Sequence, residues 1–354
     1  MKIAQRSSLA SVLATTLIVA ACGGGGGDSG SGAPGQTAPT LAITVANRDL
    51  VSHDAVAGVM SLSATTSIPL GSPASVASRT TVQRWGMASS WSGRMVGSTL
   101  DHLRVALPTA GRQQAMAVTP PLTEPCLVSG STTTTVDDRD NNGDLSVGDF
   151  GTVVFNNCRD TATETVNGTA TLLISGLDAT YLGAHLTADR MSTVTAGHSL
   201  TIDGAMLMEV WAANPVLTTI RTTAEGPVQA TISTHVPFTD TVTLAAGFVI
   251  DETIDLSVAP PVGPGAAGRT LTTLSGRMHS AGAAGTFDVT TVAGAPITRY
   301  HADDYPSAGV LRATGASGLL VLTTTSASSV VLDLDWNDDG RYESSEAKAW
   351  DWLI

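Results

Sequence analysis

The residues 241–258, "TVTLAAGFVIDETIDLSV", alternate between apolar and polar side chains, and this pattern constrains the fold more than any other feature. Every second residue from Val242 to Val258 is apolar except Glu252. The residues between them are mostly Thr, Asp, Ser, Ala or Gly, with Val249 as the exception. Successive side chains of a β-strand point to opposite faces, so the pattern predicts one buried and one solvated face.

Further strand-like segments occur at 167–177, 227–236 and 318–335, separated by turn sequences such as "AEGP" and "AGAAG". Consecutive strands with short turns favour a mainly β fold. We expect a large antiparallel meander sheet or a partly closed barrel, because closure removes exposed strand edges.

One short N-terminal helix is predicted over residues 48–62, where apolar residues follow a helical spacing and Asn47 is a residue type that caps helices. The span 66–125 has no sustained period, and we expect short strands and loops there.

The N-terminus carries a targeting signal. Lys2 and Arg6 precede an apolar run at 9–21 that is too short to span a bilayer. The run ends in Val-Ala-Ala followed by Cys22, which resembles the lipobox of bacterial lipoproteins. The resemblance implies that residues 1–21 are removed and that Cys22 becomes the mature N-terminus, carrying palmitate and other lipid. The alternative is an ordinary cleaved signal peptide.

The next segment is rich in Gly, Ser and Pro, which is typical of a flexible tether, so we divide the chain into 1–21, 22–40 and a folded domain at 41–354. Gly23, in place of Asp, predicts the outer membrane by the usual sorting rule of the lipoprotein family. The membrane is then a partner through the lipid, on either the periplasmic or the surface side.

Charge and cysteine content narrow the class of protein. The net charge is −13, and removing Lys2 and Arg6 leaves −15. Nothing basic clusters, so nucleic acid is an unsuitable partner. Cys126 and Cys158 form an even pair, which predicts a disulfide in an oxidising compartment. Metal ligation by the two thiolates is the alternative, although no CxxC or histidine has the right spacing.

A first acidic loop, "DRDNNGDLSVGD" at 138–149, looks like an EF-hand or dockerin calcium loop. Its alternate positions offer oxygen ligands, the glycine at position six permits a sharp turn, and the residue at position seven would bind through its carbonyl. The expected ligands are Asp138, Asp140, Asn142, Asp144, Ser146 and Asp149. Leu145, at position eight, is expected to fix the loop to the core.

A second match, "DWNDDGRYESSE", lies at 335–346. The expected ligands are Asp335, Asn337, Asp339, Arg341 through its carbonyl, Glu343 and Glu346. The alternative is that both clusters are polar turns. The neighbouring segments of the first loop read as strands, so we expect strand–loop–strand calcium sites that rigidify the fold.

The segment from Cys126 through the first loop to Cys158, and the C-terminal segment, also resemble parts of uncharacterised proteobacterial lipoproteins, a likeness that implies no activity. The sequence contains no HExxH, GxSxG or GxxxxGK[ST] motif. We expect an envelope lipoprotein with a calcium-binding β-rich domain in a structural or binding role. A carrier of lipids or lipoproteins is the alternative, and a hydrolase is the weakest of the three.

Overall fold

A computed structural model of the chain describes residues 40–62, 99, 103, 106, 120–160, 162, 164–195, 198–214, 216–233, 239–259 and 267–353. The chain divides into two compact units, Met1–Thr37 and Ala38–Ile354, and every described residue belongs to the second. Within these described ranges, no helix has the length and apolar character needed to cross a bilayer.

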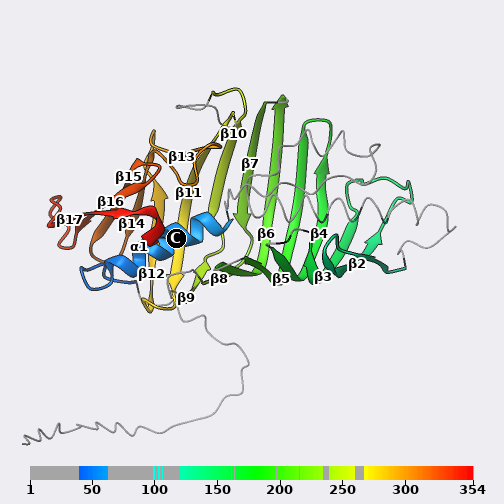
Figure 1. Cartoon of the computed structure of the whole chain (residues 1–354), viewed down its shortest axis with the longest axis horizontal. Helices are drawn as coiled ribbons and strands as arrows, with labels where there is room; N and C mark the ends of the chain where they lie inside the picture. Colours follow the sequence, from blue (N-terminus) through cyan, green and yellow to red (C-terminus); the bar gives the residue numbers. More distant parts are fainter. Residues whose placement is uncertain are drawn as a thin grey trace, which may run out of the picture. The chain divides into compact units, whose positions relative to one another are not determined.

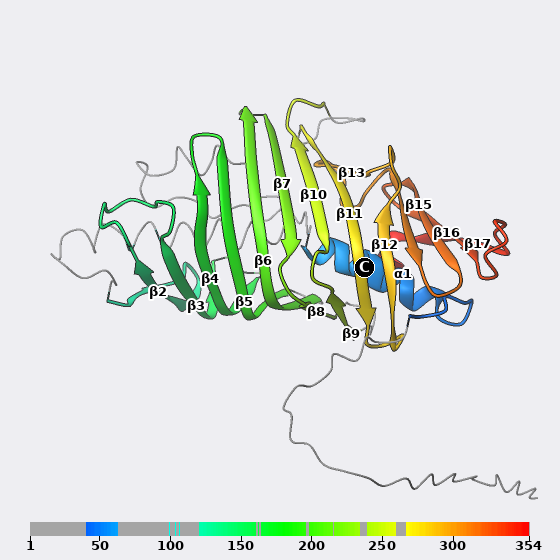
Figure 2. The same cartoon turned by 180° about the vertical axis from the view of Figure 1, so that it is seen from behind.

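The second unit is built on one antiparallel sheet of 17 strands (Figures 1 and 2). The first eight strands are β1 (Leu122–Pro125), β2 (Ser129–Asp137), β3 (Phe150–Arg159), β4 (Thr165–Leu177), β5 (Tyr181–Thr195), β6 (His198–Asn214), β7 (Leu217–Ala224) and β8 (Val228–Ser233). The other nine are β9 (Thr239–Leu244), β10 (Val249–Asp255), β11 (Arg269–Ser280), β12 (Gly285–Thr291), β13 (Ile297–Tyr300), β14 (Gly309–Thr314), β15 (Leu319–Ser326), β16 (Ser329–Asp335) and β17 (Ser344–Ala349).

Most strands pair with their neighbours in chain order, so the sheet is a meander with a branched centre. The long strand β6 pairs with β7 through its second half and with β8 through its first half. β7 then pairs with β10 and β8 with β9, and both β10 and β9 pair with β11. The ladder continues from β11 through β12, β14, β15 and β16 to β17. The predicted mainly β fold is confirmed, and the sheet is partly closed without being a complete barrel.

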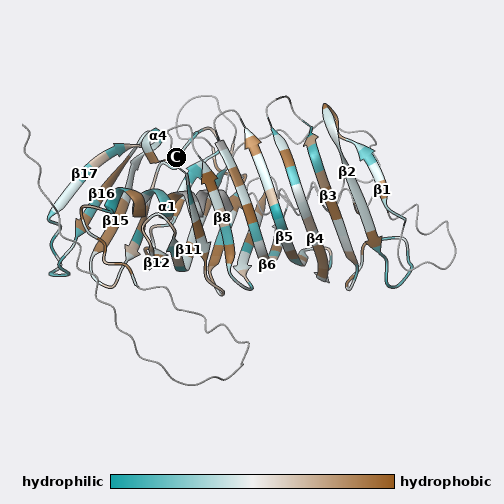
Figure 3. Cartoon of the chain, turned by 90° about the horizontal axis from the view of Figure 1, so that it is seen from below, coloured by the Kyte–Doolittle hydropathy of each residue, from teal (hydrophilic) through white to brown (hydrophobic). Residues whose placement is uncertain are grey.

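The alternating stretch at 241–258 forms two strands that lie end to end along β11. A turn at 245–248 separates β9 from β10, yet the same set of alternate residues stays buried on both sides of it. Glu252, the exception in the pattern, is also buried. The alternation recurs as bands of hydrophobic and hydrophilic residues along the strands (Figure 3). One face of the sheet therefore carries the core.

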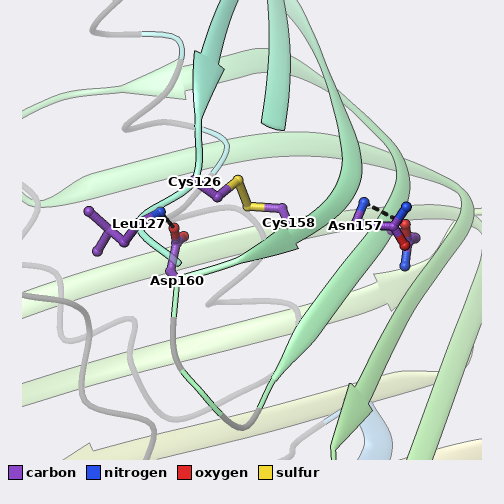
Figure 4. The surroundings of a disulfide bond; sticks show 6 residues. Cys126, Leu127, Asn157, Cys158 and Asp160 are labelled. Carbon is purple, nitrogen blue, oxygen red and sulfur yellow. Dashed lines mark hydrogen bonds between the residues drawn. A yellow bond between two sulfur atoms is a disulfide. The ribbon is translucent and has the colours of Figure 1, made fainter. Parts of the chain in front are cut away.

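A disulfide joins Cys126, directly after β1, to Cys158 in β3, with a Cα–Cα distance of 5.5 Å (Figure 4). The predicted disulfide is confirmed, and it excludes metal ligation by these thiolates. Next to it, the backbone N–H of Leu127 donates to the carboxylate of Asp160 at 3.0 Å. The disulfide closes a loop of about 33 residues that contains β2, and in the chain-entropy view this closure stabilises the fold by about 3–4 kcal/mol.

Two helices, α1 and α4, are described over their full length beside the sheet. α1 (Arg48–Leu62) occupies the range predicted from the sequence and packs on β8, β9, β11, β14 and β15. The short α4 (Trp350–Leu353) lies against it and was not predicted. Asn47 precedes α1, but its side chain accepts from the N–H of Thr44 at 2.8 Å, so it closes the preceding turn and does not cap the first helical turn.

The prediction of short strands and loops over 66–125 is correct for β1 and differs at three buried residues. Thr99, Leu103 and Ala106 have helical backbone, and their spacing of four and three residues is that of one helix face. Leu103 lies against Gly151 of β3, where a Cβ would be 2.0 Å from its methyl group. The remaining residues of 66–119 lie outside the described ranges.

Asp54 is an acidic residue in the middle of the buried face of α1, with 0% of its surface exposed. Neither of its carboxylate oxygens has a hydrogen bond of standard geometry within the described residues. The nearby Asp240 carboxylate instead accepts from Ser280 Oγ at 3.1 Å and from the N–H of Gly282 at 2.9 Å. Burial, opposed by Ser280 and reinforced by Asp240, raises the pKa of Asp54 to about 8. Folding at neutral pH therefore requires Asp54 to take up a proton.

We expect Asp54→Asn to stabilise the protein in a pH-dependent way. The native pKa lies above the unfolded value of 3.8, so the stabilisation from protonated Asp54 is complete below pH 3.8 and is lost as the pH rises to about 8. Urea unfolding should show the variant more stable than wild type by on the order of 2 kcal/mol or more near the top of this interval, and about equal at its bottom. Asp189→Asn, at an exposed position of β5, is the matched control. A wild-type advantage at high pH would contradict the assignment.

Candidate metal sites

The first acidic loop connects β2 to β3. Asp138 directly follows β2 and Asp149 directly precedes β3, and these two carboxylates are 2% and 1% exposed. Oδ2 of Asp138 accepts a hydrogen bond from the N–H of Gly143 at 2.9 Å. Oδ1 of Asp138 is buried and has no hydrogen-bond partner in the described part of the chain. A buried carboxylate oxygen without a donor is costly, so this position calls for a cation or a proton.

Three carboxylates converge in this loop. Oxygens of Asp138, Asp140 and Asp149 all lie within 4.8 Å of one another. Burial raises the pKa of Asp138, whereas the Ser146 hydroxyl is the main cause that lowers the pKa of Asp140. The backbone N–H of Ser146 also donates to Oδ2 of Asp149 at 2.7 Å. Hard oxygen atoms in an irregular loop are the ligands that Ca²⁺ prefers.

Asn142, another expected ligand of the first loop, is hydrogen-bonded to one of the three carboxylates. Asn142 donates from Nδ2 to Oδ2 of Asp140 at 2.8 Å, and its own Oδ1 accepts from the N–H of Asp144 at 2.6 Å. The Asp144 side chain is exposed and is not one of the three converging carboxylates. Leu145 packs against the core, which confirms its predicted position.

The second acidic loop connects β16 to β17 and repeats this arrangement. Asp335, the last residue of β16, is 3% exposed, and its Oδ2 accepts from the N–H of Gly340 at 2.9 Å. Its Oδ1 is buried without a partner among the described residues, as in the first loop. Oxygens of Asp335, Asp339 and Glu343 lie within 4.8 Å of one another.

The two loops have the same internal conformation. In both, the side chain at position one accepts from the N–H of position six, position three accepts from five, and position five accepts from seven. In the first loop these pairs are Asp138–Gly143, Asp140–Asn142 and Asn142–Asp144, and in the second they are Asp335–Gly340, Asn337–Asp339 and Asp339–Arg341.

Backbone dihedrals repeat as well. Position four has a positive φ of 54° at Asn141 and 59° at Asp338, and the glycines at position six have 79° and 82°. Nothing lies within 4 Å of a Cβ added at either glycine, so the backbone conformation is what requires glycine there.

The loops differ in where the third carboxylate comes from. In the first loop it is Asp149 at position twelve, whose Oδ1 accepts from the N–H of Arg139 at 3.1 Å. In the second loop Glu343 at position nine takes this role, and its Oε2 accepts from the N–H of Trp336 at 3.0 Å. Arg139 and Trp336 both occupy position two, so the two carboxylates close the loops in the same way.

Glu346, expected as the twelfth-position ligand, lies away from the carboxylate cluster of its loop. β17 begins at Ser344, so Glu346 is already paired in the sheet with Leu332. Its carboxylate forms ion pairs with Arg48 at the start of α1 and with Lys348, the latter at 2.6 Å. Lys348 is the main cause that lowers the pKa of Glu346. The early start of β17 explains this difference from the first loop.

Both loops are flanked by strands, as expected, and the helix pair of an EF-hand is replaced by the hairpins β2–β3 and β16–β17. The hairpins lie toward opposite ends of the sheet (Figure 1). Comparison with known proteins finds no matching family and no similar curated protein or solved structure. The lipoprotein and calcium-loop resemblances therefore rest on the motifs themselves.

The position-nine and position-twelve glutamates of the second loop should differ in their effect on ion binding. We expect Glu343→Gln to weaken binding there on the order of tenfold or more, because it removes one of three converging charges. Glu346→Gln should leave it nearly unchanged. The measurement is Tb³⁺ luminescence excited through the adjacent Trp336. A stronger effect of Glu346→Gln than of Glu343→Gln would contradict the arrangement.

Proposed function

We propose that this chain is an outer-membrane lipoprotein, anchored by lipid on Cys22, whose β-rich domain binds two calcium ions and serves a structural or binding role in the envelope. The observation that carries the ion sites is the pair of buried, unpartnered oxygens on Asp138 and Asp335, two residues that each converge with two further carboxylates. The anchor rests on the sequence before and including Cys22. The lipid anchor and the calcium sites both fit a location in the envelope, because calcium outside the cytoplasm is abundant enough for sites with dissociation constants of about 10⁻⁴–10⁻³ M.

Calcium is favoured over other cations by the donor set. Each cluster consists of three carboxylates, with no histidine or thiolate among the converging groups, which disfavours zinc and copper. The ligands of each site come from an irregular loop between two strands, and Ca²⁺ tolerates irregular geometry better than Mg²⁺ does.

The sites have a clear mechanical role in this fold. An open sheet has two edges, and unpaired edge strands invite fraying and aggregation. One ion would join β2 to β3 at the Asp137–Phe150 end of their hairpin, whereas the disulfide lies at its Ser129–Arg159 end. The other ion would join β16 to the last strand, β17. The disulfide and the two ions would then reinforce both ends of the ladder.

Two cavities among the described residues give the carrier alternative no support. A cavity lined by Met206, Phe248 and their neighbours holds about 10 Å³, and one beside Val56 and Trp350 holds about 20 Å³. Each has room for about one water molecule. These parts of the core are filled by side chains.

Thermal unfolding of residues 38–354, with the disulfide intact, tests the proposal. At millimolar calcium and a dissociation constant of about 10⁻⁴ M, each site should contribute about 1.4 kcal/mol, which corresponds to a rise of a few degrees over EGTA. Asp138→Ala and Asp335→Ala should each remove part of the rise, and the exposed Asp189→Ala should remove none. Equal midpoints in calcium and EGTA would reject calcium binding at these loops.

A further inference from the structure

The second loop displays two aromatic side chains beside its carboxylates. Trp336, next to Asp335 in the chain, is 40% exposed, and Tyr342, next to Glu343, is 50% exposed. At the same positions the first loop has Arg139, which is charged, and Leu145, which packs on the core. The shared loop conformation does not require this difference.

The second cluster is also more open than the first. Two of its three carboxylates, Asp339 and Glu343, are exposed, whereas only Asp140 is exposed in the first cluster. Glu346 is held by Arg48 and Lys348, so position twelve supplies no ligand. Because Ca²⁺ takes six to eight oxygens, an ion in this loop keeps more positions for outside oxygen atoms than one in the first loop.

The second loop also lies where the chain enters the folded domain. The Asp338 carboxylate accepts from the N–H of Gly318 at 3.1 Å, and the carbonyl of the adjacent Ser317 accepts from the N–H of Ile43 at 2.8 Å. Ile43 belongs to the first described segment after the Gly/Ser/Pro stretch. Anchorage at Cys22 would therefore tether the domain at the end that carries this loop.

We propose that the second loop, with its bound calcium ion, docks on an anionic phospholipid surface, and this proposal rests on the proposed calcium site. The open coordination positions of the ion accept phosphate oxygens of the headgroups. Trp336 and Tyr342 enter the interfacial layer, where amphipathic aromatic rings are favoured. The tether keeps the loop close to the membrane, so a weak contact is sufficient.

Charge makes the contact dependent on calcium. The chain without residues 1–21 carries −15, and the loop itself presents several carboxylates, so an anionic surface repels it when no ion is bound. The ion neutralises the carboxylates and attracts phosphate. Calcium thus determines whether the tethered domain is docked on the membrane.

Co-sedimentation of residues 38–354 with vesicles of phosphatidylethanolamine and phosphatidylglycerol tests the proposal. This unit carries no lipid anchor and contains both loops. We expect binding in millimolar calcium and none in EGTA, and little binding to phosphatidylcholine vesicles. The double change Trp336→Ala and Tyr342→Ala should weaken binding on the order of tenfold. Trp211→Ala, which removes an exposed tryptophan of β6, is the matched control and should have no effect.

The two ion sites provide the second comparison. Asp335→Ala should abolish vesicle binding, and Asp138→Ala should leave it intact. If calcium raises the unfolding midpoint through Asp335 but the protein does not sediment with the vesicles, docking is rejected and the calcium site stands. If Asp335→Ala removes no part of the calcium-dependent rise, both fail. Equal sedimentation in calcium and EGTA, or of the aromatic double variant and wild type, would also overturn docking.

Discussion

Backbone pairing between successive antiparallel strands is the constraint on which the rest of this structure depends. A meander of 17 strands satisfies nearly every strand on both sides and places one alternate set of residues on the core face. The same arrangement leaves two ends that must be stabilised by other means. The disulfide and the first loop lie near β1, and the second loop lies at β17. The disulfide and both acidic loops are therefore found near the edge strands of the sheet.

The two acidic loops show how one short motif produces two different sites. The glycine at position six and the residue at position four adopt the same dihedrals in both, and the same three side chains accept backbone hydrogen bonds. The site then depends on where the next strand starts. β3 starts after position twelve and leaves Asp149 in the cluster, whereas β17 starts at position ten and turns Glu346 toward α1. Glu343 takes the place of Glu346 as the third carboxylate of the second cluster, and two of the three carboxylates are then exposed to solvent.

The sequence predicted features that depend on local periodicity. These features are the alternation at 241–258, the helix at 48–62, the strands around the first loop and the packing of Leu145, which all follow from spacing within a few residues. Features that depend on contacts distant in sequence were missed. The pairing of Glu346 with Arg48, 298 residues away, and the approach of Asp54 to Asp240 arise only when α1 lies on the sheet.

The central claim is that the buried, unpartnered oxygens of Asp138 and Asp335 face bound calcium. Isothermal titration of calcium into residues 38–354 tests it most directly, because the stoichiometry counts the sites without relying on stability. The account predicts two ions per chain, and one in each of the variants Asp138→Ala and Asp335→Ala. A wild-type protein that takes up no calcium at millimolar concentration would contradict it, and the acidic loops would then be polar turns between strands.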